Sequence, residues 1–413
     1  MKLEQIGFYT LSDERCQNSS ENSSLQRCEL ILTGRCNFKC PYCRRVGGPD
    51  MPFLEASRTV QLWASQGLRA IRFSGGEPTL YPGLYDLVST ARDLGIKYVA
   101  LSTNGSAKRG VYDRLLACGV NDFSISLDAC CVEDNLLMTG GVKSSWDTVV
   151  ANIRYLSMKT YVTVGIVLTD QNVDKVNSIV SFAASLGVHD IRIIPAAQNG
   201  DRLKDVEVDD TLIAKFPILA YRVRNIQQGK PVRGLRPCDT TRCGLVLDDM
   251  AVNGGQHYPC IIFLREGGEA IGKVGENMRE ERKAWYDKTN THENPICKSQ
   301  CLDVCSFYNN QYDKFHRLQQ YVFSIPRIDE TEFDWFRWRQ GSPRDLFGIS
   351  CHSGELIKSR ARLREFAVGW CPGECLICRP KLNTVAVMFF KDGRHSWFHL
   401  FTHEFYKIFE VSN

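Results

Sequence analysis

The stretch LTGRCNFKCPYC, residues 32–43, follows directly on an apolar run and carries three closely spaced cysteines. Its C-x3-C-x2-C spacing places Cys36, Cys40 and Cys43 on one short loop. Three thiolates at this spacing can hold three corners of a cubane iron–sulfur cluster and leave one iron open. An open iron can chelate the amino and carboxylate groups of a ligand, which an all-thiolate site cannot. The alternative is a zinc site completed by a distant fourth ligand.

Outward from this loop, apolar strand-like runs alternate with amphipathic helical stretches. Short strands separated by helices indicate β/α units and a parallel sheet. Six strands are too few for a closed eight-stranded barrel, so we expect an α/β fold with a partial (β/α)6 TIM-like barrel. The expected strands are Cys28–Thr33, Ala70–Ser74, Tyr98–Asn104, Asp122–Leu127, Tyr161–Leu168 and Asp190–Pro195.

Small and polar residues mark the ends of these strands. The second strand ends in the sequence SGGEP, residues 74–78, where glycines allow close approach to a ligand. Strand alternation puts Ser102 and Asn104 on one face of the third strand, and Ser126 and Asp128 on one face of the fourth. Because chemistry in such folds lies at the carboxyl ends of parallel strands, these side chains are expected to share one site.

The cysteine spacing, the GGEP sequence and the strand ends together resemble the radical SAM superfamily over about residues 28–200. The resemblance implies a 4Fe-4S cluster on Cys36, Cys40 and Cys43 that binds S-adenosyl-L-methionine (SAM) and cleaves it reductively. It implies that Glu77 meets the SAM amino group. It also implies SAM contacts elsewhere, and the full candidate set is Gly75, Gly76, Glu77, Ser102, Asn104, Ser126 and Asp128. A reductant protein such as flavodoxin or ferredoxin is implied as a partner.

A second cysteine group begins at Cys243, followed by a spacer and then the sequence G-x4-C ending at Cys260. This opening resembles the SPASM and twitch auxiliary-cluster domains of the same superfamily. The later spacing C-x3-C-x3-C departs from a full SPASM pattern and is closer to a twitch domain with one auxiliary 4Fe-4S cluster. Our first choice of ligands is Cys243, Cys260, Cys297 and Cys301, with Cys305 as the alternative to Cys301. A zinc ribbon is the competing interpretation, because four thiolates suit both metals.

A third group, Cys371, Cys375 and Cys378, repeats the first spacing without the strand-end motifs after it. We expect a structural zinc there, completed by Cys351 or His352, with a second auxiliary cluster or metal-free thiols as alternatives. His395, His399 and His403 are spaced so that pairs of them could share a helix face, although packing explains them better.

Composition and charge limit the classes of function and the cellular location that the sequence allows. The 413 residues carry a net charge of +4, which makes no case for nucleic-acid binding, and no apolar run is long enough to span a membrane. Eighteen cysteines without an export signal indicate a reducing, cytoplasmic location. The expected organisation is an N-terminal extension (1–27), the barrel (28–200), a linker (201–238), the auxiliary domain (239–310) and a C-terminal α+β extension (311–413).

The sequence leaves the substrate open. The segment before the first strand is too short for a leader-peptide-binding domain, which favours a small molecule such as a sugar, nucleoside or antibiotic precursor. The expected reaction is an oxidation, epimerisation or rearrangement begun by hydrogen-atom abstraction. A peptide or protein substrate is the runner-up and RNA comes third. An iron–sulfur sensor without catalysis is the alternative of another class, against which the intact SAM motifs argue.

Overall fold

The computed structural model of the protein describes residues 16, 19–142, 145–197, 206–239, 242–324, 367–370, 385–391 and 394–400. Side chains are described within these ranges up to residue 313, and at residue 316. The chain forms two compact units, Met1–Asp313 and Lys314–Asn413. Among the described residues, no helix is both long and apolar enough to cross a membrane.

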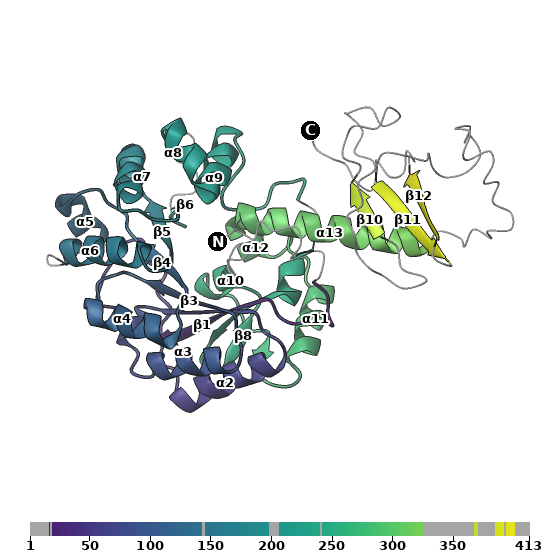
Figure 1. Ribbon diagram of the computed structural model, residues 1–413, viewed down its shortest axis with the longest axis horizontal. Helices are drawn as coiled ribbons and strands as arrows, with labels where there is room; N and C mark the ends of the chain where they lie inside the picture. Colours follow the sequence, from purple (N-terminus) through teal and green to yellow (C-terminus); the bar gives the residue numbers. More distant parts are fainter. Residues whose placement is uncertain are drawn as a thin grey trace. The chain divides into compact units, whose positions relative to one another are not determined.

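The first unit is built on one nine-stranded sheet in the order β6-β5-β4-β3-β2-β1-β7-β8-β9 (Figure 1). Neighbouring strands from β6 to β7 are parallel, and β8 and β9 extend the sheet in antiparallel fashion. Because the order is linear, the sheet is open, and the predicted partial barrel is confirmed. The parallel strands are β1 (Arg27–Thr33), β2 (Ala70–Gly75), β3 (Tyr98–Thr103), β4 (Asp122–Ser126), β5 (Tyr161–Leu168), β6 (Asp190–Pro195) and β7 (Asp249–Asn253).

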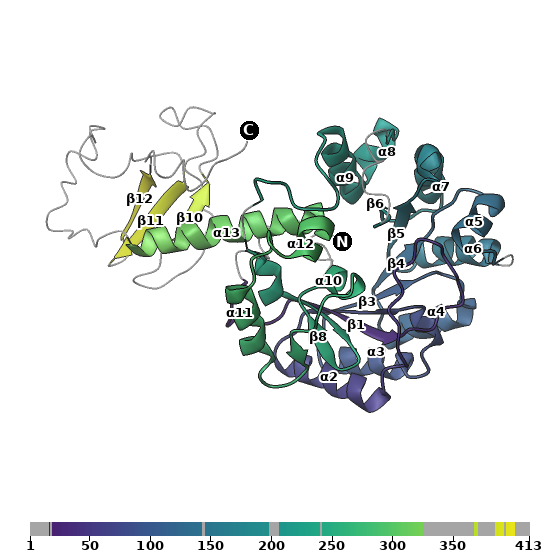
Figure 2. The ribbon, with the colours of Figure 1, turned by 180° about the vertical axis from the view of Figure 1, so that it is seen from behind.

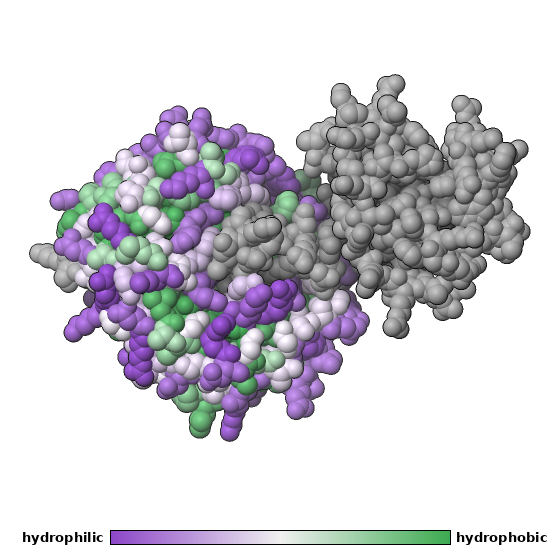
Figure 3. Space-filling view, viewed as in Figure 1, coloured by the Kyte–Doolittle hydropathy of each residue, from purple (hydrophilic) through white to green (hydrophobic). Residues whose placement is uncertain are grey.

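Helices follow most of the parallel strands and cover the outer face of the sheet (Figure 1). Each turns an apolar stripe inward, as α3 does with Leu84, Leu87, Val88 and Ala91. On the face shown in Figure 3, hydrophilic residues surround small hydrophobic patches. The helices are α2 (Phe53–Ser65), α3 (Leu84–Asp93), α4 (Arg109–Cys118), α5 (Val132–Met138), α6 (Trp146–Ser157) and α7 (Val176–Ser185), with short 3-10 turns η2 (Pro78–Leu80) and η3 (Val173–Lys175).

The two faces of the parallel sheet differ in polarity. Leu30, Phe73, Leu101, Ile125 and Val164 are buried in the core between the sheet and its helices. Side chains alternate along a strand, so their neighbours in sequence point to the inner, concave face. That inner face carries charged and hydroxyl residues, namely Glu29, Arg72, Ser74, Ser102, Asp122, Ser124, Thr163 and Arg192. The barrel interior is therefore polar and suits a polar ligand.

The predicted linker, residues 201–238, contains two helices where the structure describes it. Helices α8 (Asp210–Lys215) and α9 (Pro217–Gln227) occupy this segment, and α9 packs on β6. Leu219, Val223 and Ile226 recur at helical spacing and are buried. Polar residues between them, including the buried Arg222, hide this periodicity in the sequence.

The cysteine-rich part of the first unit grows from the β7 edge of the sheet. Figures 1 and 2 show α10, α11 and α12 gathered beside β8. Helix α11 contacts η5 and β9, and α10 contacts α12. The elements are η5 (Gly244–Leu247), β8 (Gln256–Tyr258), α10 (Ile261–Arg265), β9 (Gly272–Lys273), α11 (Met278–Lys288), α12 (Pro295–Gln300) and α13 (Asp303–Ser324).

The second unit contains a three-stranded antiparallel sheet in the order β10 (Ala367–Trp370), β11 (Val385–Lys391), β12 (Arg394–Leu400). His395 and His399 lie in β12, so they do not share a helix face. Strand alternation rather than a helical turn relates them. His403, the third cysteine group, Cys351 and His352 lie outside the described residues.

Candidate active site and auxiliary cysteine site

The first cysteine loop leaves the carboxyl end of β1. Cys36 and Cys43 are exposed and Cys40 is partly buried. Between them, Phe38 is buried in the core and its backbone N–H donates to the Cys36 Sγ at 3.4 Å. Phe38 therefore anchors the loop while the outer thiols remain accessible to a ligand.

Contacts from two neighbouring strand ends and from α5 fix the loop in place. The Asn104 amide donates to Asn37 Oδ1 at 2.8 Å, just beyond β3. The Tyr42 hydroxyl donates to the Asp128 carboxylate, just beyond β4. The Lys39 N–H donates to the carbonyl of Thr139, after α5, at 3.0 Å. These contacts hold the loop against the carboxyl ends of β3 and β4.

Gly75 and Gly76 lie where the backbone of the β1 end and the start of the cysteine loop passes very close. A Cβ on Gly75 would lie 2.4 Å from the Thr33 carbonyl oxygen, and one on Gly76 would lie 2.2 Å from that of Arg35. The Glu77 N–H donates to the Arg35 oxygen at 2.7 Å. We assigned these glycines to the close approach of a ligand, and the structure shows in addition a close approach of the chain to itself.

The Glu77 side chain is 1% exposed, and its oxygens already accept four hydrogen bonds from the protein. Oε1 accepts from the Thr79 N–H, the Thr79 hydroxyl and the Thr103 hydroxyl, and Oε2 accepts from the Asn104 N–H. Burial raises the pKa of this carboxyl group. Glu77 thus ties the GGEP turn to the end of β3, and the expected contact between its carboxylate and the SAM amino group stays a prediction.

Replacing Glu77 by alanine is expected to destabilise the protein by about 2–4 kcal/mol, because buried donors lose their acceptor. SAM affinity should fall together with stability. Thermal unfolding and SAM titration of Glu77→Ala measure both quantities, and Glu276→Ala, at an exposed position, is the matched control. Weaker SAM binding with an unchanged unfolding midpoint would support the predicted direct contact between Glu77 and SAM.

Asp128 is also buried and engaged. Besides Tyr42, its carboxylate accepts from the Val167 N–H of β5 at 2.6 Å. Burial raises the pKa of Asp128 to about 6. The Asp128 carboxylate holds Tyr42 of the cysteine loop against β4 and β5, and its contact with SAM stays a prediction.

Three predicted strand-end residues, Ser102, Asn104 and Ser126, are not buried. Ser126 is exposed and the other two are partly exposed. Among the described residues, the hydroxyls of Ser102 and Ser126 have no hydrogen-bond partner, so both are available to a ligand at the edge where the cysteine loop lies. The Asn104 side chain is engaged with Asn37 and Ser106.

The sequence analysis missed Arg192, on the inner face of β6. Its guanidinium has one hydrogen bond, from Nη2 to the Ser124 hydroxyl at 3.5 Å, and its buried Nε has no partner among the described residues. Gly165 leaves room beneath it, because a Cβ at this position would lie 3.4 Å from Nη2. Burial, and then the charges of Arg72 and Arg222, lower its pKa to about 10. The signal was a charged residue at an inward position of the otherwise apolar strand IRIIP.

The five cysteines of the second group come together in space from separate elements. Cys243 precedes η5, Cys260 precedes α10, Cys297 lies in α12, Cys301 ends α12, and Cys305 lies in the first turn of α13. Burial raises the pKa of Cys243 to about 11, and the nearby Cys305 raises it further. Burial and the neighbouring thiols raise the pKa of Cys297 to about 12 in the same way.

The sulfur spacing bears on which metal this group suits. A single zinc ion with Zn–S bonds of about 2.3 Å draws its sulfurs to about 3.8 Å from one another. Across the part of the chain that the structure describes, no three sulfurs of this group lie mutually within 4.8 Å. The described sulfurs of this group are therefore not gathered as closely as a single zinc ion would hold them.

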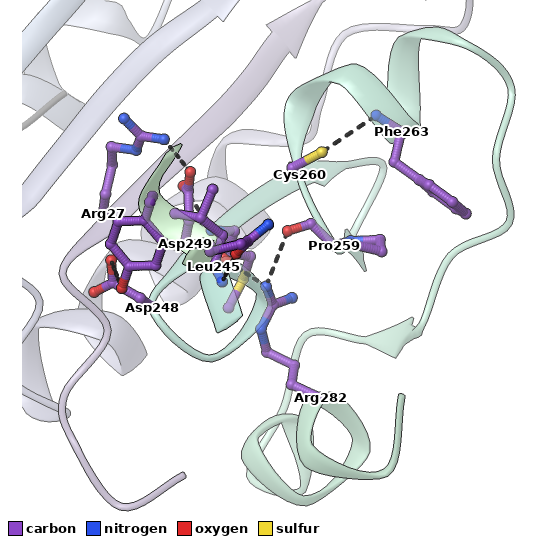
Figure 4. A network of polar contacts seen from close by, with 11 residues as sticks. Arg27, Leu245, Asp248, Asp249, Pro259, Cys260, Phe263 and Arg282 are labelled. Atoms are coloured by element: carbon purple, nitrogen blue, oxygen red, sulfur yellow. Dashed lines mark hydrogen bonds and ion pairs between the residues drawn. The ribbon is translucent and has the colours of Figure 1, made fainter. Parts of the chain in front are cut away.

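Arg282 fixes the hairpin that carries the first two of these cysteines (Figure 4). Its fully buried guanidinium donates to the Val246 carbonyl at 2.7 Å, after Cys243, and to the Pro259 carbonyl at 3.3 Å, before Cys260. Further bonds reach the carbonyls of Asp249 and Tyr258. One side chain thus locks both ligand-bearing turns to β7 and β8.

Helix α9 fixes the later cysteines. Asp303, between Cys301 and Cys305, forms a buried ion pair with Arg222 and accepts from the Asn225 amide at 2.8 Å. The Asp303 N–H donates to the Val232 carbonyl at 3.0 Å. The segment expected to be a linker therefore positions the auxiliary site.

Comparison with known proteins agrees with this geometry. The family model of the radical SAM superfamily matches residues 30–183. These residues are a radical SAM domain. The cysteine-rich region that follows is consistent with an auxiliary-cluster domain.

Similar relatives include proteins named as GTP 3′,8-cyclases. The probable enzyme of Sulfurisphaera tokodaii is 26% identical over 49% of this chain and 66% of its own length. That of Methanococcus maripaludis is 25% identical over 66% of this chain and 96% of its own. The Staphylococcus epidermidis enzyme is 32% identical over 40% of this chain and 48% of its own. The match thus covers from about half to nearly all of each relative.

Solved structures with a related fold include Streptococcus suis SuiB, at a TM-score of 0.46 and 17% identity, covering 66% of this chain and 68% of that one. Another is anSMEcpe with bound AdoMet, at a TM-score of 0.44 and 15% identity, covering 73% of this chain and all of that one.

Proposed function

We propose that this radical SAM enzyme cleaves SAM reductively and abstracts a hydrogen atom from an anionic small molecule. The observation that carries the proposal is the meeting of the Cys36, Cys40 and Cys43 loop with open hydroxyls of Ser102 and Ser126 at one sheet edge. Three accessible thiols on an anchored loop fit a three-ligand 4Fe-4S cluster.

Each group of the chain has a defined task in this proposal. The three thiolates hold the cluster and leave one iron for SAM, and the glycine pair keeps the loop backbone against β1. Ser102 and Ser126 offer hydrogen bonds to SAM, and Tyr42 is held by Asp128. When bound, the cluster and SAM supply a 5′-deoxyadenosyl radical after one-electron reduction by a flavodoxin- or ferredoxin-type protein.

Arg192 supports an anionic substrate. A buried guanidinium with spare donors binds phosphate or carboxylate strongly, because charge-assisted hydrogen bonds gain strength away from water. The relatives are named for a nucleotide, GTP, which is a small molecule of this charge class. We therefore place the substrate among phosphorylated or carboxylated small molecules, which include nucleotides and sugar phosphates.

Changing Arg192 to leucine is expected to weaken binding of such a molecule by about ten- to a hundredfold, from the loss of about 1.5–3 kcal/mol. Spectroscopic titration of the unreduced, SAM-loaded protein with GTP and with guanosine separates the contribution of the phosphates to the affinity from that of the nucleoside. Arg192→Lys should retain part of the GTP affinity. Arg58→Leu, on an exposed face of α2, should retain all of it.

Two results would contradict the anionic substrate. One is equal affinity for GTP and guanosine in the unchanged protein, together with equal affinity of a sugar phosphate and its sugar. The other is an Arg192→Leu protein that binds the phosphorylated compounds as tightly as before. In either case SAM cleavage itself, followed as 5′-deoxyadenosine formed with dithionite, would still test the rest of the proposal.

We also propose that the second cysteine group holds one auxiliary 4Fe-4S cluster. Its ligands are Cys243, Cys260 and Cys297 with Cys301 or Cys305, and the convergence of these cysteines from separate elements supports it. When bound, such a cluster supplies electron transfer. The third group remains a proposed zinc site.

Anaerobic reconstitution should load about eight irons per chain, four for each of two clusters. The double variant Cys243→Ser/Cys260→Ser should hold about four, because the first group is untouched. Cys118→Ser, a partly buried thiol at the end of α4, should keep all eight. About twelve irons would make the third group a cluster, and about four in the unchanged protein would make the second group a zinc site.

A further inference from the structure

A third set of ligand atoms lies outside both cysteine sites, in the turn between β4 and α5. The sulfurs of Cys130 and Cys131 and a carboxylate oxygen of Asp134 all lie within 4.8 Å of one another. Both cysteines are partly buried and Asp134 is 8% exposed. The sequence analysis passed over this set, because adjacent cysteines lack the two-residue or longer gap typical of metal-ligand motifs.

The local backbone explains why the three groups converge. Side chains of adjacent residues in an extended strand point to opposite faces, but β4 has ended and the chain bends at Cys130 and Cys131. Cys131 is the residue before α5, with extended φ −149° and ψ 169°. Asp134 lies in the first turn of α5, where side chains point back toward the start of the helix. The bend and the helical turn thus direct three donors to one point.

The local charge suits a divalent cation. The Lys175 ammonium lies 2.6 Å from Asp134 Oδ1. Cys130 and Cys131 also lie close enough to Lys175 to interact with its charge. With both thiols ionised, two thiolates, one carboxylate and one ammonium leave two negative charges, which a divalent ion neutralises.

We propose that Cys130, Cys131 and Asp134 bind one thiophilic divalent ion of the zinc class. Two sulfurs and one oxygen supply three corners of a tetrahedron, and water supplies the fourth. Two thiolates disfavour magnesium and calcium, which prefer oxygen ligands. Sulfurs this close together suit a single ion, in contrast to the wider spacing of the auxiliary group.

The position of this site gives the ion a structural consequence. Upstream of the trio, Asp128 holds Tyr42 of the first cysteine loop. Downstream, the Thr139 carbonyl at the end of α5 accepts from Lys39 of the same loop. An ion at the turn between these two contacts braces the support of the catalytic loop without touching SAM.

The test uses Cd²⁺ as the probe on the fully reconstituted protein, in which iron occupies the two cluster sites. Equilibrium dialysis with metal analysis, together with thiolate-to-cadmium ultraviolet absorption, gives stoichiometry and affinity. The number of Cd²⁺ ions bound per chain is compared between the unchanged protein and its variants. An ion bound by the third cysteine group adds equally to each and does not affect the difference. We expect Cys130→Ser/Cys131→Ser to bind one Cd²⁺ fewer per chain, and Cys118→Ser to bind as many as the unchanged protein.

Asp134→Asn separates ligand loss from misfolding, because it keeps the shape of the side chain. It should load the same iron as the unchanged protein and bind the Cd²⁺ at this site about tenfold or more weakly. Equal Cd²⁺ stoichiometry and affinity in all variants would overturn the proposal. So would a mass showing that Cys130 and Cys131 are joined as a disulfide in the reduced, reconstituted protein. If the double serine variant fails to fold, Asp134→Asn decides alone.

Discussion

Replacing Cys36, Cys40 and Cys43 together by alanine is expected to abolish formation of 5′-deoxyadenosine from SAM. These thiols are the only ligands proposed to leave an open iron, and without it SAM has no site at which to receive an electron. Their loop is anchored by Phe38 and by contacts to three other segments, so the fold should survive the change. Product analysis after incubation with SAM and dithionite measures the effect, with a loss beyond the detection limit expected.

The control for this variant is its remaining iron. About four irons should stay, on the second cysteine group, and Cys118→Ala should retain full activity. The assignment of the catalytic cluster is wrong if the triple variant still yields 5′-deoxyadenosine. Loss of all iron would instead show that the two cysteine sites depend on each other for loading.

The second large effect is expected from Gly76→Ala. A methyl group there would meet the Arg35 carbonyl oxygen at 2.2 Å, and a backbone atom cannot rotate away as a side chain can. The start of the cysteine loop must move, which misplaces thiols that have to hold one cluster. Displacements of about 1 Å in such a site cost about a hundredfold in rate, so SAM cleavage should fall by at least that factor.

Gly110→Ala is the matched control for this substitution. Gly110 lies near the start of α4 with open space around its position, so alanine there should leave activity intact and stabilise the helix by up to about 1 kcal/mol. SAM cleavage and iron content are measured for both variants. Full activity of Gly76→Ala would show that the close contact between Gly76 and Arg35 does not position the cysteines.

Much of the barrel was predictable because its signals are local. Runs such as 161–168 are apolar and strand-length, and the glycines and prolines between them mark turns. The cysteine spacing in 36–43 is also local. Helix α9 was missed because Arg222 and Asn225 interrupt its apolar face, and their burial depends on Asp303, which lies far away in the sequence.

The candidate site was predictable in position but not in detail. Strand alternation placed Glu77 and Asp128 at the correct edge of the sheet. It could not reveal that these carboxylates accept hydrogen bonds from Thr103, Asn104 and Tyr42, because those donors come from other strands and from the cysteine loop. A polar residue at a strand end looks the same in the sequence whether it meets a ligand or a neighbour.

By itself, the sequence determined the class of this protein, its parallel β/α order and the thiols that can hold clusters. These properties follow from spacing along the chain, which short-range geometry converts directly into structure. Only the tertiary structure decided which side chains remain open, how Arg282 and Arg222 fix the auxiliary cysteines, and that Cys130, Cys131 and Asp134 converge. Those outcomes depend on desolvation and on partners distant in the sequence, and the spacing of residues along the chain predicts neither of these.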